Sequence, residues 1–238
     1  MGRRSIDDSE PQRLSRAAAH RLSLYLRCLA AWPADGGKIS SGQIADSVGV
    51  NDAQVRRDLA ALGNLGQRGI GYEARDLILA IRQTLGIDRT WRAVLVGVGN
   101  LARALLRYQG FRAQGFDIVG LFDSDEKKIG QVIEGLTVEP LEKLAARVAS
   151  QKAELGVLTV PAAAAQVVAE SLAKAGIRGI LNFAPQLLRL PGEIKIVSVD
   201  LAIQLEQLAF QVQFPEATRH GDPIRDDLAS PGVETDAP

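Results

Sequence analysis

Hydrophobic residues recur at helical spacing through the first third of the chain. Between residues 17 and 32 they return every three or four positions, and a proline and two glycines follow, which predicts a first helix with one buried face. Ser40 or Ser41 is placed to cap a short second helix, which breaks at a Val-Gly-Val turn. Asn51 then caps a third, with Gln54 three residues on as in a capping box. Two short helices about a glycine-containing turn predict a helix-turn-helix.

The third helix has one apolar stripe and one polar face. Val55, Leu59 and Leu62 fall at i, i+4 and i+7, and at about 100° per residue Arg57 points almost directly away from them. Residues 63–72 follow at once; they are too rich in glycine for a helix and suit a small hairpin with a basic residue near its tip. Helix-turn-helix followed by such a hairpin is the layout of a winged-helix DNA-binding domain. An outward arginine is also common as a plain solvated residue, so both interpretations stay open at this point.

A short apolar run at 91–96 breaks into closely spaced glycines and then resumes at helical period, which predicts strand, turn and helix. Gly97 allows the tight turn, Gly99 lets the main chain approach a pyrophosphate, and the N–H groups that open the helix face its charge. A second apolar run ends in Asp123, 21 residues past Ala102, where an acidic residue accepts hydrogen bonds from the adenine ribose hydroxyls. This spacing predicts a site for NADH and NAD+. The alternative is a glycine turn in an α/β unit that binds nothing, with Asp123 as a helix cap.

Strands and helices continue to alternate along the rest of the chain. Strands are expected at 116–122, 136–138, 155–160, 179–183 and 194–199, and helices at 141–149, 162–175 and 200–214. The run at 155–160 is apolar throughout, as in a strand buried on both faces, and Pro161 suits the first turn of the next helix. Strands that alternate with crossover helices predict an α/β fold with a doubly wound, mostly parallel sheet of the Rossmann type.

The chain of 238 residues is long enough for two modest domains, and its ends differ from its middle in charge. Residues 1–92 carry 14 basic and 10 acidic side chains, whereas 215–238 carry six acidic and two basic ones among several prolines and glycines. The expected organisation is a disordered N-terminus at 1–13, a winged-helix domain at 14–88, a Rossmann domain at 89–199, a C-terminal helix at 200–214 and a disordered acidic tail at 215–238.

Cysteine and long apolar runs are scarce. A single cysteine, Cys28, excludes an intrachain disulfide framework and any multi-cysteine metal site, and it suits a reducing compartment. No apolar run approaches about 18 residues and no charged-then-apolar leader opens the chain, so neither membrane insertion nor secretion is indicated. The sequence predicts a cytoplasmic protein without a metal site.

Seven short motifs run through both predicted domains. They are Leu24-Tyr25-Leu26-Arg27, Val55-Arg56-Arg57-Asp58-Leu59, Arg68-Gly69-Ile70-Gly71-Tyr72, Gly97-Val98-Gly99-Asn100-Leu101, Leu158-Thr159-Val160-Pro161, Gly179-Ile180-Leu181-Asn182-Phe183-Ala184-Pro185 and Val199-Asp200-Leu201-Ala202. In this order they resemble the signatures of the Rex family of redox-sensing transcriptional repressors, from about residue 14 to residue 214. The resemblance implies a homodimer with a winged helix, a Rossmann domain and a final helix exchanged between subunits. It also implies binding to palindromic operator DNA at low NADH and release when NADH accumulates.

The resemblance, together with the patterns above, assigns the site residues. For DNA they are Ser40, Ser41, Gln54, Arg56, Arg57, Arg68, Gly69 and Tyr72. For NADH and NAD+ they are Gly97, Val98, Gly99, Asn100, Leu101, Ala102, Asp123, Thr159, Val160, Pro161, Asn182, Phe183, Ala184 and Pro185. For a switch they are Arg27, Tyr108, Asp200 and Leu201. In the implied switch Asp200 attracts the oxidised ring or binds Tyr108 in one state and pairs with Arg27 in the other. The plainer reading makes Asp200 a helix N-cap and Arg27 a surface residue.

The chain departs from the family pattern at three places. The third glycine of the turn motif is Ala102, at a position that serves helix-strand packing. After the predicted recognition helix the family commonly has aromatic residues, whereas this chain has Ala60-Ala61-Leu62. A phenylalanine that reaches the partner's nicotinamide site in some members is Leu201 here, which weakens the case for redox discrimination through that side chain.

An NAD-dependent oxidoreductase with a helical N-terminal appendage is the competing interpretation. A dehydrogenase needs a His, Lys or Tyr that moves a proton as the hydride moves. His20 and His220 lie outside the nucleotide-binding region, and the loops after the later strands offer prolines and alanines, which leaves Tyr108 as the candidate. Inert residues around a nicotinamide suit sensing without turnover, so no enzyme is expected. A purely structural interaction module, a third interpretation, does not explain the glycine motif with Asp123.

Overall fold

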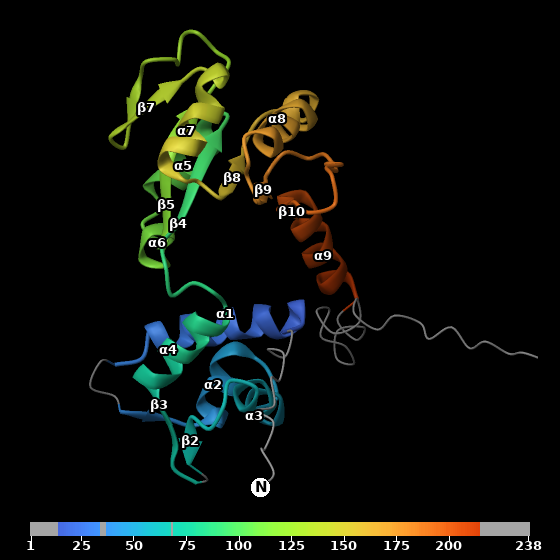
Figure 1. Ribbon diagram of the computed structural model, residues 1–238. Coiled ribbons are helices and arrows are strands. Elements are labelled where there is room, and N and C mark those ends of the chain that lie inside the picture. Colours follow the sequence, from blue (N-terminus) through green and yellow to red (C-terminus); the bar gives the residue numbers. More distant parts are fainter. Residues whose placement is uncertain (1–13, 34–36, 68, 215–238) are drawn as a thin grey trace, which may run out of the picture. The chain divides into compact units, whose positions relative to one another are not determined.

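The computed structural model describes residues 14–33, 37–67 and 69–214, and Figure 1 shows it as a ribbon. The chain divides between Asp88 and Arg89 into two compact units. Three predicted features lie outside the described residues: the N-terminus at 1–13, the wing residue Arg68 and the acidic tail at 215–238. Among the described helices, none combines the length and the apolar character that crossing a membrane requires.

The first unit consists of helices and a small antiparallel sheet. Its elements are α1 (Arg16–Ala30), β1 (Lys38–Ile39), α2 (Ser41–Val48), α3 (Asp52–Ala60), β2 (Gly66–Gln67), β3 (Gly71–Glu73) and α4 (Ala74–Thr84). Strand β3 lies between β1 and β2 and pairs antiparallel with both. Helices α2 and α3 followed by the β2-β3 hairpin give the predicted helix-turn-helix and wing (Figure 1).

Side-chain caps fix the starts of α2 and α3. Of the two serines proposed as caps, Ser40 is the one that acts: the Gln43 N–H donates to Ser40 Oγ at 3.1 Å, and the Ser40 N–H donates to Gln43 Oε1 at 2.9 Å. Asn51 caps α3 by accepting a main-chain N–H at 2.7 Å. The predicted capping box of Asn51 with Gln54 is wrong, because residues further along α3 hold the Gln54 amide.

All four helices of the first unit pack around one apolar core. Its fully buried members are Leu22, Tyr25, Ile39, Ile44, Val55, Leu77 and Ile81, with Leu29 and Leu59 almost as enclosed. The stripe predicted for α3 therefore faces the core, and Arg57 is exposed on the other side of the helix. Burial of this stripe, rather than the helix propensity of a nine-residue segment, holds α3 in place.

The second unit is built on a seven-stranded sheet. Its elements are β4 (Trp91–Val96), α5 (Asn100–Arg107), α6 (Gly110–Ala113), β5 (Phe116–Phe122), β6 (Val132–Ile133), β7 (Leu136–Glu139), η1 (Leu141–Lys143), α7 (Leu144–Gln151), β8 (Leu155–Leu158), α8 (Ala162–Lys174), β9 (Gly179–Asn182), β10 (Lys195–Ser198) and α9 (Leu201–Gln213). The strand order is β10-β9-β8-β4-β5-β7-β6. Strand β6 pairs antiparallel with β7, and the other neighbouring pairs are parallel, as the alternation of strands and helices predicts.

Both faces of this sheet are covered, and β4 shows why. Val94 and Val96 belong to a buried cluster that includes residues of α7 and α8, whereas Ala93 and Leu95 belong to a second cluster that includes Ala102 of α5. Successive side chains of a strand point to opposite faces, so helices lie on both sides of β4. Ala102 thus has the packing role expected for the third position of the turn motif.

Helix α9 keeps its apolar side chains uncovered in this single chain. Every residue of α9 except Gln211 is exposed. The apolar ones include Leu201, Ile203, Leu205, Leu208, Phe210 and Val212. A helix that is apolar on several sides needs a covering surface, and the described residues of the second unit do not provide one.

Candidate dinucleotide site and nucleic-acid interface

Four parallel strands end in one row at the carboxyl edge of the sheet. Val96 of β4 is level with Phe122 of β5 and Leu158 of β8, and Leu158 is level with Asn182 of β9. The chain order reverses between β4 and β8, which is the place where open α/β sheets bind ligands. The loops that leave this row carry the predicted cofactor residues: Gly97 to Ala102 after β4, Asp123 after β5, Thr159 to Pro161 after β8, and Asn182 to Pro185 at the end of β9.

The turn after β4 has no room for a side chain at its first glycine. Gly97 has φ +95°, and a Cβ there would lie 2.8 Å from the Thr159 carbonyl oxygen. The Thr159 hydroxyl donates to the Gly97 carbonyl at 2.7 Å and ties this turn to the end of β8. Gly99 is the N-cap of α5 without a side-chain cap, and a Cβ there would meet no described atom within 4 Å. A bare backbone beside uncapped helix N–H groups fits a pyrophosphate.

Asp123 directly follows β5 and is a buried carboxylate held by three donors. The Val98 N–H lies 2.7 Å away, the Asp125 N–H 2.9 Å and the Lys128 Nζ 3.0 Å. Burial acts to raise the pKa of Asp123, but these donors outweigh it and hold the pKa below its ordinary value. A carboxylate has about four acceptor positions, so Asp123 keeps room for a ribose hydroxyl. Sequence reasoning missed Lys128, since a lysine in a polar loop gives no signal of its own.

Asn182 is wholly buried and shapes the loop after β9. Its Oδ1 accepts from the Ala184 N–H at 2.9 Å, and its Nδ2 donates to the Gln186 carbonyl at 2.9 Å. The amide is thus engaged in holding the loop. The residues that the loop then offers, Phe183, Ala184 and Pro185, carry no acid or base.

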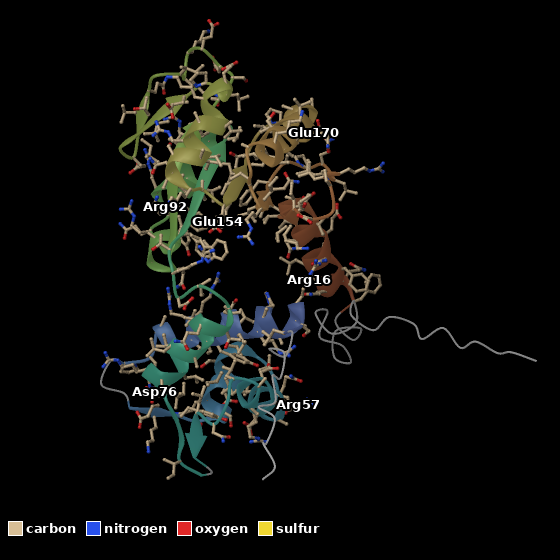
Figure 2. All side chains as sticks on the ribbon, viewed as in Figure 1. Arg16, Arg57, Asp76, Arg92, Glu154 and Glu170 are labelled. Carbon is tan, nitrogen blue, oxygen red and sulfur yellow. The ribbon has the colours of Figure 1, made fainter. Side chains whose placement is uncertain are left out.

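The outer face of α3 carries the predicted DNA residues. Arg56 and Arg57 are both exposed, and Figure 2 shows Arg57 extending from α3 away from its unit. Arg56 is paired with Asp52 one turn earlier. The Ser41 hydroxyl and Arg56 lower the pKa of Asp52, so Ser41 of α2 also belongs to this polar surface. Gln54 donates and accepts hydrogen bonds within α3.

Asp58 lies on the inner side of α3 and links it to α1. Its carboxylate accepts from Arg21 Nε and Nη2, both at 2.7 Å, from the Tyr25 hydroxyl at 2.8 Å and from Gln54 Nε2 at 2.9 Å. Burial acts to raise the pKa of Asp58, but Arg21 and the other donors bring it below its ordinary value. Burial and Asp58 in turn raise the pKa of Tyr25. The sequence pattern gave no sign that this acid is buried beside an arginine of the first helix.

The β2-β3 hairpin is held by an aromatic ring. The Tyr72 ring lies so close to Gly66 that a Cβ on Gly66 would be 2.6 Å from it. Tyr72 also packs against the core of the first unit. Gly69, with φ +77°, is in the turn between the strands, next to Arg68, which lies outside the described residues. For Tyr72 the structure shows a packing role in the wing.

The residues of the implied switch occupy separate places. Arg27 is an exposed residue in the last turn of α1, in the first unit. In the second unit Asp200 caps α9 by accepting the Ala202 N–H at 2.9 Å, and Leu201 after it is exposed. Tyr108 follows α5 and lines a cavity of about 750 Å³ beside α6 and the first residues of β5, at the end of the sheet away from Gly99. Within one chain, Asp200 thus has the plainer role of an N-cap.

Comparison with known proteins covers both units. Residues 13–60 match the family described as "Putative DNA-binding protein N-terminus", and residues 88–186 match the CoA binding domain family. The redox-sensing transcriptional repressor Rex of Carboxydothermus hydrogenoformans is 46% identical over 202 residues, which cover 84% of this chain and 97% of that protein. Its counterpart in Rhodopirellula baltica is 45% identical over 201 residues, which cover 84% of this chain and 85% of that protein.

Solved structures of RSP, a Rex-family repressor, have the same fold. RSP in complex with β-NAD+ and operator DNA aligns with a TM-score of 0.80 and 32% identity over 87% of this chain and 96% of that one. RSP in complex with β-NADH aligns with a TM-score of 0.77 and 30% identity over 87% of this chain and 98% of that one. The chain belongs to the Rex family of redox-sensing transcriptional repressors.

Proposed function

We propose that this chain is a transcriptional repressor that binds palindromic operator DNA and is released from it when NADH binds, so that it senses the ratio of NADH to NAD+. The observation that carries the proposal is the presence of two sites in one chain. One is the exposed arginine face of α3, and the other is the sheet edge where Gly97, Gly99 and Asp123 form a dinucleotide site. A repressor acts where the DNA is, so we place the protein in the cytoplasm.

The dinucleotide site has a distinct task for each loop. The uncapped start of α5 binds the pyrophosphate, and Asp123 binds the adenine ribose. The loops at Thr159 to Pro161 and at Asn182 to Pro185 line the nicotinamide position on either side. NADH and NAD+ differ at that ring by a hydride and one positive charge, which is the redox signal. The second loop offers no acid or base beside the ring, so the protein binds the cofactor without turning it over.

A palindromic operator requires two copies of the recognition helix related by a two-fold axis. The exposed apolar residues of α9 supply a reason for two chains to associate, because a second copy can cover them. We therefore propose a homodimer in which α9 packs on the partner subunit. Asp200, at the start of α9, then stands at the subunit interface with Tyr108 and Arg27 within reach from one chain or the other, as the family resemblance implies.

An electrophoretic shift assay tests DNA binding and cofactor response together. The probe is a duplex that the wild-type protein enriches from a random pool, and the comparison is a scrambled duplex of the same composition. We expect a palindromic enriched sequence, a shifted band of two chains per duplex, and loss of that band with NADH at concentrations where NAD+ leaves it in place. Failure to enrich any sequence, or equal release by NADH and NAD+, would contradict the proposed function.

A further inference from the structure

The amide of Gln54 has one possible orientation in α3. Gln54 lies between Asp58, four residues on, and Arg57, three residues on, so one side chain spans both. The Asp58 carboxylate is ionised and can only accept hydrogen bonds, so the Gln54 NH2 group must face it, at 2.9 Å. That leaves Gln54 Oε1 facing the Arg57 guanidinium, which can only donate, at 2.8 Å. The Asp58 carboxylate thus accepts from the Gln54 NH2 group, and Gln54 Oε1 accepts from the Arg57 guanidinium; the reverse orientation of the amide would lose both hydrogen bonds.

This chain of contacts starts from a fixed point. Asp58 is 7% exposed, and Arg21 and Tyr25 hold its carboxylate from the α1 side at 2.7 to 2.8 Å. Gln54 is half-buried, and Arg57 is exposed on the outer face of α3, as Figure 2 shows. The order inward to outward is therefore Asp58, Gln54, Arg57. A rigid carboxylate at one end restrains a flexible guanidinium at the other.

We propose that Gln54 is a positioning residue that holds Arg57 for base recognition and does not itself read a base. The inference rests on the proposed function, because it concerns how α3 recognises operator DNA. Each end of the Gln54 amide already has one partner on α3, which orients the amide toward Arg57 and leaves only its second N–H and its second lone pair for a base. The Arg57 guanidinium has about five N–H donors and uses one of them on Gln54. The others are available for guanine O6 and N7 in the major groove.

Arg56 provides the internal comparison. It lies next to Arg57 on the same exposed face, but its partner is Asp52 at the start of the helix, not the buried Asp58. Asp52 is partly exposed, and its other partner is the Ser41 hydroxyl of α2, in contrast to the arginine and tyrosine that hold the buried Asp58. Gln54 therefore restrains Arg57 and leaves Arg56 unaffected.

A double-mutant cycle separates positioning from direct reading. The four proteins are the wild type, Gln54→Ala, Arg57→Ala and the double variant, each measured on the enriched duplex and on the scrambled duplex. A bidentate arginine contact discriminates about 5- to 150-fold, so Arg57→Ala should lower the ratio of the two affinities within that range. Gln54→Ala should lower it about 3- to 10-fold, since an unrestrained Arg57 must be ordered on binding.

The decisive result is Gln54→Ala in the Arg57→Ala background. If Gln54 acts through Arg57, the double variant should match Arg57→Ala within about twofold, the usual scatter of additive sites. If Gln54 reads a base itself, its full effect persists in the double variant, and the proposal is overturned. The same holds if Gln54→Ala leaves the affinity ratio unchanged.

Two controls guard against trivial outcomes. Gln54→Ala removes one of the four hydrogen bonds to Asp58, a loss that the better helix propensity of alanine partly offsets, so it should lower the thermal unfolding midpoint no more than Tyr25→Phe does. Tyr25→Phe removes a hydrogen bond from the other side of Asp58 and should lower the midpoint; it should leave the affinity ratio intact, because Arg21 still holds both oxygens of Asp58. Failure of the proposed function can be told apart from failure of this inference. If the proposed function is wrong, the wild type enriches no duplex. If only the inference is wrong, the wild type does enrich a duplex, and the two substitutions reduce its binding independently.

Discussion

In the proposed cofactor site, the Asp123 carboxylate serves both the fold and the nucleotide. Its oxygens accept two main-chain N–H groups and the Lys128 ammonium, so the acid fixes the glycine turn, and its remaining acceptor position is the one we propose for the ribose. The Lys128 ammonium neutralises part of the negative charge of Asp123. On a nucleotide with a 2′-phosphate, Asp123 would therefore repel the phosphate and Lys128 would attract it.

We expect the wild type to prefer NADH to NADPH and Asp123→Ala to reduce that preference by about tenfold or more, equivalent to about 1.4 kcal/mol. Without the acid, Lys128 is left to pair with the 2′-phosphate. Titration by nicotinamide fluorescence measures both nucleotides. The matched control is the double variant with Lys128→Ala, in which the gain for NADPH should vanish. Equal affinities for the two nucleotides in the wild type would remove Asp123 from cofactor selection.

Asp58 makes the stability of the first unit sensitive to acid. Its pKa is lowered in the folded state, so its contribution is present above the unfolded pKa of about 3.9 and is lost as the pH falls through the folded pKa. We expect Asp58→Asn to be less stable than the wild type at pH 7 by up to about 3 kcal/mol, at the low end for a broken buried pair because Arg21 is partly exposed. This difference in stability should start to narrow below about pH 4 and should close as the pH falls through the folded pKa. Unfolding followed by circular dichroism between about pH 7 and about pH 2 measures it, and a constant difference over that range would contradict this role.

At the scale of elements, the turn between β4 and α5 contains one glycine that the backbone requires, Gly97, and one that we propose for pyrophosphate binding, Gly99. Gly97 has a positive φ and a Cβ there would collide with the Thr159 main chain, whereas Gly99 has ordinary extended φ and open space around it. The two glycines are two residues apart. An alanine substitution at each should therefore have opposite effects, on stability at Gly97 and on cofactor binding at Gly99.

Gly97→Ala should destabilise the second unit by about 2 kcal/mol or more. The cost of a positive φ at alanine adds to the cost of the collision between its Cβ and the Thr159 main chain. Gly99→Ala should leave thermal unfolding within about 0.5 kcal/mol of the wild type, as for other changes that meet no neighbour. It should nevertheless weaken NADH binding strongly, because the methyl group stands where the pyrophosphate approaches the backbone. Unfolding scans and NADH titration on both variants test this. Gly99→Ala with unimpaired NADH binding would place the pyrophosphate elsewhere.

Most elements could be predicted from the sequence because their signals are strong and local. The strands β4, β5, β8 and β9 are apolar runs, and the glycine turn marks the only place where strand, turn and acid have dinucleotide spacing. The short elements α6 and β6 escaped because four and two residues show no period. The capping box at Gln54 failed for another reason: its spacing was correct, but a buried carboxylate at Asp58 competes better for the amide.

At the scale of the whole molecule, the proposed redox response depends on contacts that the described residues of one chain do not make. Asp200 caps its own helix, and the apolar side chains of α9 remain exposed. A sequence pattern can mark these residues as a motif, but in the proposed dimer their partners come from a second copy. If NADH and operator DNA compete through the spacing of the two recognition helices, each must weaken the binding of the other by the same factor.

The charge of Asp200 can be separated from its capping role. Asn caps helices as well as Asp does, so Asp200→Asn should keep α9, the dimer and NADH binding intact. It should nevertheless lose most of an NADH-dependent release from DNA of about 5- to 150-fold, the usual range of allosteric coupling. Asp200→Ala should lose the same release and in addition about 1 kcal/mol of stability with the cap. The shift assay with NADH, run beside light scattering for the dimer, measures all three proteins. If Asp200→Asn still releases DNA at wild-type NADH concentrations, the carboxylate charge is not the sensor, and burial of the nicotinamide ring between subunits must drive the change alone.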